Sequence, residues 1–109
     1  MKLPKRFQLM GRKIEVVERV DLLQDRDWTG AAVYSQDKIE LLPTSEIYVR
    51  SQAAVEQTFF HELVHHLLYH AGGAINHDLK SGGYLHKNEE FVDLLGSLLH
   101  QAVTSAEYD

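Results

Sequence analysis

The 109-residue sequence contains no cysteine. Without cysteine the chain can form neither a disulfide framework nor a thiolate metal site, so any metal ion must be bound by histidine and carboxylate side chains. Long apolar runs are also missing. None approaches the roughly 20 residues of a membrane span, and the first residues do not lead into the apolar core of a secretion signal. We therefore expect a cytoplasmic protein with no membrane partner.

Positive charge is scarce for a protein that mainly binds nucleic acid. Eleven basic residues against sixteen acidic ones give a formal net charge of −5, whereas nucleic-acid binding depends on clustered lysine and arginine. Five of the eleven basic residues nevertheless precede the first acid, Glu15. This group is either a solvated hairpin surface or a docking patch for an acidic partner.

The chain is predicted to form a single domain, 1–109. No internal repeat, low-complexity tract or linker divides it, and its length lies within the range of one domain, about 50 to 250 residues. Segments with strand character come first, in two pairs joined by turn residues. They are Arg6–Met10 with Lys13–Val17, joined at Gly11-Arg12, and Gly30–Tyr34 with Ile39–Leu42.

Two helices are predicted to follow the strands. The first runs from Ser51, a good N-cap, to Gly72, where Gly72-Gly73 favours a left-handed stop. A polar, glycine-rich loop covers Ala71–His86, and Asn88 caps a second helix that ends near Thr104. The expected fold is therefore α+β: a small antiparallel sheet followed by two helices.

One pentapeptide of the first helix, His61-Glu62-Leu63-Val64-His65, matches the pattern HExxH. Residues four apart lie on one helix face with Cβ atoms about 5–6 Å apart, so two imidazoles can bind one ion. Glu62 lies about 100° round the helix, where it can act as a general base. The pattern also occurs in helices with incidental histidines. Here, however, both histidines border an apolar stripe, formed by Phe60, Leu63, Val64, Leu67 and Ala71.

A second histidine pair, His66 and His70, is also four residues apart. It projects about 140° away from the first pair, so the two pairs cannot share an ion. We expect these two histidines to be partly exposed surface residues.

A catalytic zinc site usually has a third protein ligand. The candidates after the first helix are His77, His86, Glu89 and Glu90. On the second helix Glu89 shares a face with Asp93 and Gly96, and that face can point at the first helix, whereas Glu90 lies on the polar side. We therefore predict Glu89 as the third ligand and Glu90 in solvent, with Gly96 allowing the two backbones to approach. Asp93 is predicted to accept a hydrogen bond from a ligating imidazole, that of His61.

The combination of His61-Glu62-x-x-His65 with Glu89-x-x-x-Asp93 resembles the ligand arrangement of gluzincins. The wider context is similar to ImmA/IrrE-type metallopeptidases and related compact phage-type HExxH proteins. In these, an I-x-L-like strand precedes a TxxHExxH helix, as Ile39-Glu40-Leu41 and Thr58-Phe59-Phe60-His61 do here. The resemblance covers roughly Gly30–Leu99. It implies a minimal zincin-like domain with one zinc ion per chain and hydrolysis of peptide bonds.

The expected function is that of a zinc-dependent peptidase that acts on a protein or peptide substrate. Tyr84 and His86 are the candidates for a second electrophile that stabilises the oxyanion. Substrate would lie as an added strand along Ile39–Leu42 if that strand is the sheet edge.

Two alternatives to a peptidase stay open. One is a catalytically weak metal-binding protein that acts by binding a host or regulatory partner. The other is a structural zinc site, in which His86 or His77 would have to supply the fourth ligand. The sequence leaves the oligomeric state open.

Overall fold

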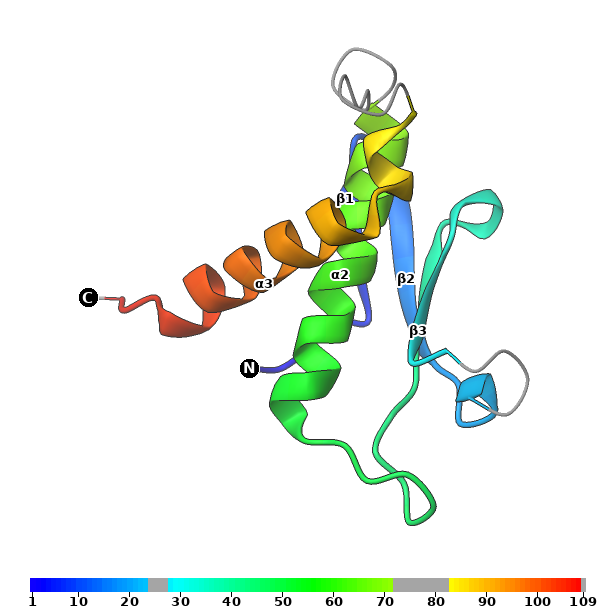
Figure 1. Ribbon diagram of the computed structural model, residues 1–109, viewed down its shortest axis with the longest axis vertical. Coiled ribbons are helices and arrows are strands. Elements are labelled where there is room, and N and C mark those ends of the chain that lie inside the picture. Colours follow the sequence, from blue (N-terminus) through cyan, green and yellow to red (C-terminus); the bar gives the residue numbers. More distant parts are fainter. Residues whose placement is uncertain (24–27, 72–82, 109) are drawn as a thin grey trace.

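The computed structural model describes residues 1–23, 28–71 and 83–108. In Figure 1 helix α2 (Gln52–Ala71) lies between a small sheet on one side and helix α3 (Glu89–Ser105) on the other. The sheet precedes both helices in the chain. Its strands are β1 (Arg6–Leu9), β2 (Arg12–Glu18), β3 (Gly30–Val33) and β4 (Lys38–Leu41). This arrangement confirms the α+β class.

The first hairpin turns at Met10 and Gly11, one residue earlier than predicted. Leu9 pairs with Arg12, and the two residues between them have φ angles of 52° and 79°. Positive φ at both central residues is typical of the type I′ turn, whose twist matches that of the flanking strands.

The sheet has the order β1-β2-β4-β3, and β4 pairs in parallel with β2. The prediction of a wholly antiparallel sheet was therefore wrong at this pairing, although β1 with β2 and β3 with β4 are antiparallel. Strand β4 lies inside the sheet, and its Ile39 and Leu41 are 0% and 2% exposed. Among the described residues the edges of the sheet are β1 and β3.

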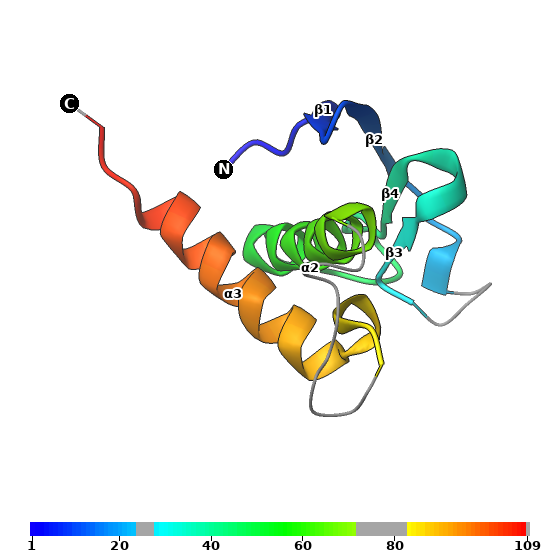
Figure 2. The same ribbon diagram turned by 90° about the horizontal axis from the view of Figure 1, so that it is seen from above.

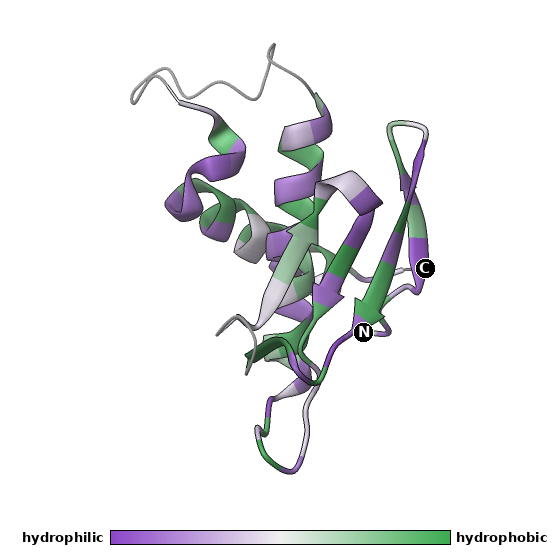
Figure 3. Ribbon diagram, turned by 90° about the vertical axis from the view of Figure 1, so that its right-hand side faces the viewer, coloured by the Kyte–Doolittle hydropathy of each residue, from purple (hydrophilic) through white to green (hydrophobic). Residues whose placement is uncertain are grey.

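Helix α2 is buried on two sides. Ile14, Ile39 and Leu41 of the sheet pack against Phe59 and Phe60, and a second cluster joins α2 to α3. That second cluster consists of Val64, Leu68 and Val92. In β1 and β4 hydrophobic residues alternate with polar or charged ones (Figure 3), so one face of these two strands supplies apolar side chains to this core. The HExxH segment thus lies between two packed surfaces.

Both predicted helix starts are confirmed. The Ser51 hydroxyl accepts a hydrogen bond from the Ala54 amide at 3.1 Å, and the Asn88 side chain accepts one from the Phe91 amide at 3.1 Å. A short 3₁₀ turn, η2 (Leu85–Lys87), precedes α3. The predicted stop at Gly72-Gly73 lies outside the described residues.

The C-terminal half of α3 extends beyond its partner helix (Figures 1 and 2). As a result, Leu98, Ala102 and Val103 are exposed, although their spacing places them with the buried Val92 on one apolar arc. In the described part of the chain, neither α2 nor α3 has the length and apolar character needed to cross a membrane.

Candidate metal centre

The structure brings together the three predicted ligands His61, His65 and Glu89. The two histidines lie one turn apart in the middle of α2, and Glu89 is the first residue of α3. His61 Nε2 lies 2.9 Å from Glu89 Oε2, and His65 Nε2 lies 3.1 Å from Glu89 Oε1. One potential ligand atom from each residue lies within 4.8 Å of the others, so the group can hold a metal ion.

Gly96 lets α3 cross α2 directly over the HExxH segment. A Cβ atom at this position would lie 3.1 Å from both the backbone nitrogen and the Cα of His61. Backbone atoms cannot move aside as a flexible side chain can, so a larger residue would push the helices apart. The predicted close approach at Gly96 is therefore confirmed, and it keeps the first turn of α3 beside the two histidines.

The other ring nitrogens of the two histidines face oxygen acceptors. His65 Nδ1 donates a hydrogen bond to the His86 carbonyl at 2.6 Å, and His61 Nδ1 lies 3.4 Å from Asp93 Oδ1. A hydrogen on Nδ1 leaves the Nε2 lone pair directed at the shared site, which is how metal-binding imidazoles are commonly oriented. Asp93 thus lies beside His61 at ion-pair distance, and the hydrogen bond predicted between them stays a prediction. The His86 carbonyl was not predicted, because a backbone acceptor has no signature in the sequence.

The donor set fits a metal ion. Two imidazole nitrogens and one carboxylate are the protein ligands of many catalytic zinc sites. Two ligands of a tetrahedral zinc ion, each about 2.1 Å from the metal, lie about 3.4 Å apart. The nitrogen–oxygen distances of 2.9 and 3.1 Å involve two different oxygens of Glu89, and one ligand atom from each residue lies within 4.8 Å of the others, so the side chains would adjust to bring three atoms to that spacing.

A cleft of about 620 Å³ opens beside the metal group and reaches strand β3. Glu62 lines this cleft, although only 8% of the residue is exposed. A Cβ atom at Gly30 would lie 3.2 Å from Glu62 Oε2, so glycine leaves room for this carboxylate between the metal group and β3. Burial raises the pKa of Glu62 to about 7, with an opposing effect of His61 and a further rise from the negative charge of Glu89.

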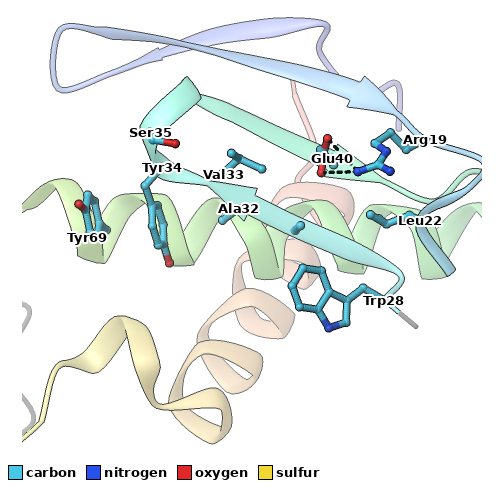
Figure 4. A pocket seen from close by; sticks show the side chains of 10 residues that line it. Arg19, Leu22, Trp28, Ala32, Val33, Tyr34, Ser35, Glu40 and Tyr69 are labelled. Carbon is cyan, nitrogen blue, oxygen red and sulfur yellow. Dashed lines mark hydrogen bonds and ion pairs between the residues drawn. The ribbon is translucent and has the colours of Figure 1, made fainter. Parts of the chain in front are cut away.

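Tyr34, the first residue after β3, also lines the cleft. Figure 4 shows its ring projecting from the strand with the hydroxyl group at the far end. Burial, together with the negative charges of Glu62 and Glu89, raises the pKa of Tyr34, so the phenol keeps its proton and can donate a hydrogen bond. Sequence reasoning missed this residue because no motif marks it. Its place at the end of a predicted strand was the only available signal.

Tyr84 and His86, the two predicted electrophiles, are not among the residues that line the cleft. Tyr84 is 52% exposed. The buried His86 ring packs edge-on against Tyr34 and Tyr69, with centroid distances of 5.7 and 5.3 Å. The contribution of His86 to the site is its backbone carbonyl.

His66 is fully buried, so the expectation of a surface histidine was wrong for this residue. Its Nε2 donates a hydrogen bond to the Lys38 carbonyl at 2.8 Å, and its Nδ1 lies 3.3 Å from His70 Nε2. The helical wheel assumed one buried face, whereas α2 packs against the sheet as well as α3. A buried imidazole pays little desolvation penalty when it is neutral and hydrogen-bonded.

The other candidate ligands lie elsewhere. Glu90 is exposed, as predicted, and His77 falls outside the described residues. Within the described ranges the metal group has three members, and His86 is not one of them. The structural-zinc alternative therefore has no fourth ligand in the described part of the chain.

Comparisons of the chain with protein-family models, curated proteins and solved structures gave no significant match. The resemblance to gluzincins therefore stays a prediction, carried by the sequence motif and by the geometry of the metal group.

The two adjacent acids at the start of α3 should differ sharply in their effect on metal binding. Glu89→Ala removes a carboxylate that contacts both histidines, so zinc affinity should fall by more than tenfold. Glu90→Ala removes an exposed acid about 100° away on the helix and should leave affinity unchanged. Competition with a chromophoric chelator measures both constants. Equal losses for the two variants would contradict the assignment of Glu89 as a ligand.

Replacing Asp93 should weaken metal binding moderately while leaving the three ligands in place. Loss of a group that orients a ligating imidazole typically costs about 10–100-fold in affinity. Because the Asp93 side chain is 76% exposed, we expect Asp93→Ala to give the lower end, about tenfold. Asp93→Asn should be milder, since its amide oxygen can still accept a hydrogen bond. Wild-type zinc affinity in Asp93→Ala, measured by the same chelator competition, would make Asp93 a solvated acid only.

Proposed function

We propose that this protein is a zinc-dependent peptidase in which Glu62 is the general base. One observation carries the proposal: the buried Glu62 carboxylate lies in a single cleft between a three-ligand metal group and the edge of β3. An active site needs an acid–base group, an electrophile and a place for substrate within contact distance. In this cleft Glu62 would be the acid–base group, the metal group would hold the electrophile, and the edge of β3 would bind substrate.

Each residue of the cleft would have its own role in the reaction. His61, His65 and Glu89 would hold the ion, which when bound polarises a carbonyl group and acidifies water. Glu62 would take a proton from the attacking water and pass it to the leaving amine. Tyr34 would donate a hydrogen bond to the oxyanion that develops on the substrate carbonyl. Zinc is the proposed metal because its catalytic sites use this donor set, although other first-row ions also accept it.

Substrate would add to the sheet at β3. The earlier expectation placed it along Ile39–Leu42 on the condition that this strand forms the edge, but β4 lies inside the sheet. Strand β3 pairs with β4 on one side and lines the cleft on the other. An extended peptide bound there by backbone hydrogen bonds would pass beside Glu62 and the metal group.

The proposal is tested by comparing the new protein N-termini that appear in a cell extract after treatment with wild type or Glu62→Gln protein, each loaded with zinc. Wild type should produce N-termini that the variant does not, because the amide cannot take up a proton. If the two proteins give the same N-termini, the peptidase proposal is wrong. A protein that acts by binding a partner would give that result.

Tyr34→Phe should lower turnover more than substrate binding. Loss of one donor to an oxyanion typically costs about 10²–10³ in kcat, and phenylalanine keeps the ring that stacks on Tyr69 at 4.1 Å. Steady-state kinetics on a peptide found in the N-terminus experiment should show a lower kcat with KM nearly unchanged. Tyr48→Phe is the matched control, because Tyr48 lines neither the metal cleft nor the pocket on the other face of β3. Equal activity of both variants would remove Tyr34 from the mechanism.

A further inference from the structure

The outer edge of β3 offers its backbone to a partner strand. The Leu42 amide donates to the Thr29 carbonyl at 2.9 Å, and the β3–β4 register continues from this pair. Opposite residues of an antiparallel pair of strands alternate between hydrogen-bonded and non-hydrogen-bonded pairs. Gly30 and Ala32 are therefore in non-hydrogen-bonded pairs, and their N–H and C=O groups point away from β4. No strand in the described part of the chain pairs with that side of β3.

A peptide added at this edge would direct alternate side chains to opposite faces of the sheet. Residues opposite Gly30 and Ala32 would face α2 and the metal cleft, since a Cβ atom at Gly30 would meet Thr58 and Glu62 of that helix. Residues opposite Ala31 or Val33 would face the other way. The outer sheet face therefore meets every second side chain of the peptide.

A second hollow, which we call the outer pocket, lies on that outer face of the sheet (Figure 4). It has a volume of about 440 Å³, and its walls include Leu22, Ala31, Val33 and the Arg19–Glu40 ion pair. Trp28 and Tyr34, at opposite ends of β3 in Figure 4, line both this pocket and the metal cleft. The two hollows thus flank one strand and meet at its edge.

The charged groups around the outer pocket are paired with one another. Arg19 lies 3.3 Å from Glu40 and 3.1 Å from Asp21, and Lys38 lies 3.3 Å from Glu40. Among the described residues, these two cations and two carboxylates balance, so they leave no net charge for an ionic ligand to match. Apart from Ser35, the rest of the described wall is aliphatic or aromatic, and it includes the fully buried Leu22. Such a pocket favours an uncharged apolar side chain, because burial of a charge without a partner is costly.

We propose that the outer pocket is a specificity subsite for one apolar side chain of an extended peptide paired with β3. The proposal rests on the peptidase function for its substrate and adds the residue class that the substrate carries. It predicts selectivity for an apolar residue at one peptide position whose side chain points away from the metal. The side chains of the neighbouring positions would contact the metal cleft instead.

The test uses a synthetic decapeptide library with the zinc-loaded full chain. Mass spectrometry identifies the cleavage sites. Peptides with Leu, Met or Phe at one position should be cleaved with a kcat/KM at least about tenfold higher than peptides with Asp or Lys there. Val33→Phe, which narrows the pocket, should shift this position toward Ala and Gly, and Val33→Ala should shift it toward larger residues. Val17→Phe is the matched control. Val17, on β2, pairs with Glu40 of β4 and does not line the pocket.

The same library, printed as an array and probed with labelled Glu62→Gln protein, reports binding without hydrolysis. Binding that requires the apolar residue supports the subsite even if wild type cleaves nothing, in which case the peptidase proposal alone fails. Cleavage with no apolar preference, or with a preference that neither Val33 variant alters, overturns the subsite and leaves the peptidase intact. Neither binding nor cleavage would overturn both.

Discussion

Replacing both His61 and His65 by alanine is expected to reduce the zinc content of the purified protein from about one ion per chain to none. The two imidazoles supply two of the three ligand atoms that the structure brings together, and the exposed Glu89 carboxylate cannot retain zinc alone. Metal analysis by mass spectrometry of the desalted protein measures the loss directly.

The double variant should also lose the stability that bound zinc provides. An ion present at about 1,000 times its Kd stabilises a folded chain by about 4 kcal/mol, so removing the site should lower Tm by several degrees. Wild type stripped with a chelator is the control, and it should unfold near the temperature of the variant. If the variant keeps one zinc ion per chain, the metal lies elsewhere and the assignment of these histidines is wrong.

Glu62→Gln should lower kcat for peptide hydrolysis by about 10²–10⁴ while leaving the zinc content at about one ion per chain. General acid–base catalysis typically contributes a factor of this size, and the amide that replaces the carboxylate cannot carry the proton. Glutamine has nearly the same shape, so it should fit in the space that Gly30 leaves open. Because it removes a buried carboxylate, the substitution should leave Tm unchanged or raise it.

Glu90→Gln is the matched control for this variant, since it makes the same chemical change at an exposed position of α3. Initial rates on one purified peptide, with zinc content and thermal unfolding measured on the same samples, separate loss of chemistry from loss of metal or fold. Full activity in Glu62→Gln would exclude Glu62 as the base. Loss of zinc in that variant would instead indicate that Glu62 supports the metal group.

The parts of the site that depend on the geometry of single helices could be predicted from the amino-acid order alone. His61 and His65 lie on one face because the α-helix has 3.6 residues per turn, and that period also separates Glu89 from Glu90. Ser51 and Asn88 mark the helix starts because their side chains satisfy free backbone amides. Gly96 indicated a close helix crossing because it has no side chain. All of these are local properties, readable within a few residues.

The groups that surround the metal ligands depend on contacts between distant segments of the chain. Strand order depends on long-range pairing, so the sequence could not show that β3 is the edge or that Tyr34 reaches the cleft. His66 is buried because α2 packs on two sides, which a helical wheel does not represent. The acceptor for His65 is a backbone carbonyl, that of His86. Every residue has such a carbonyl, and only the path of the chain in space brings this one to the imidazole.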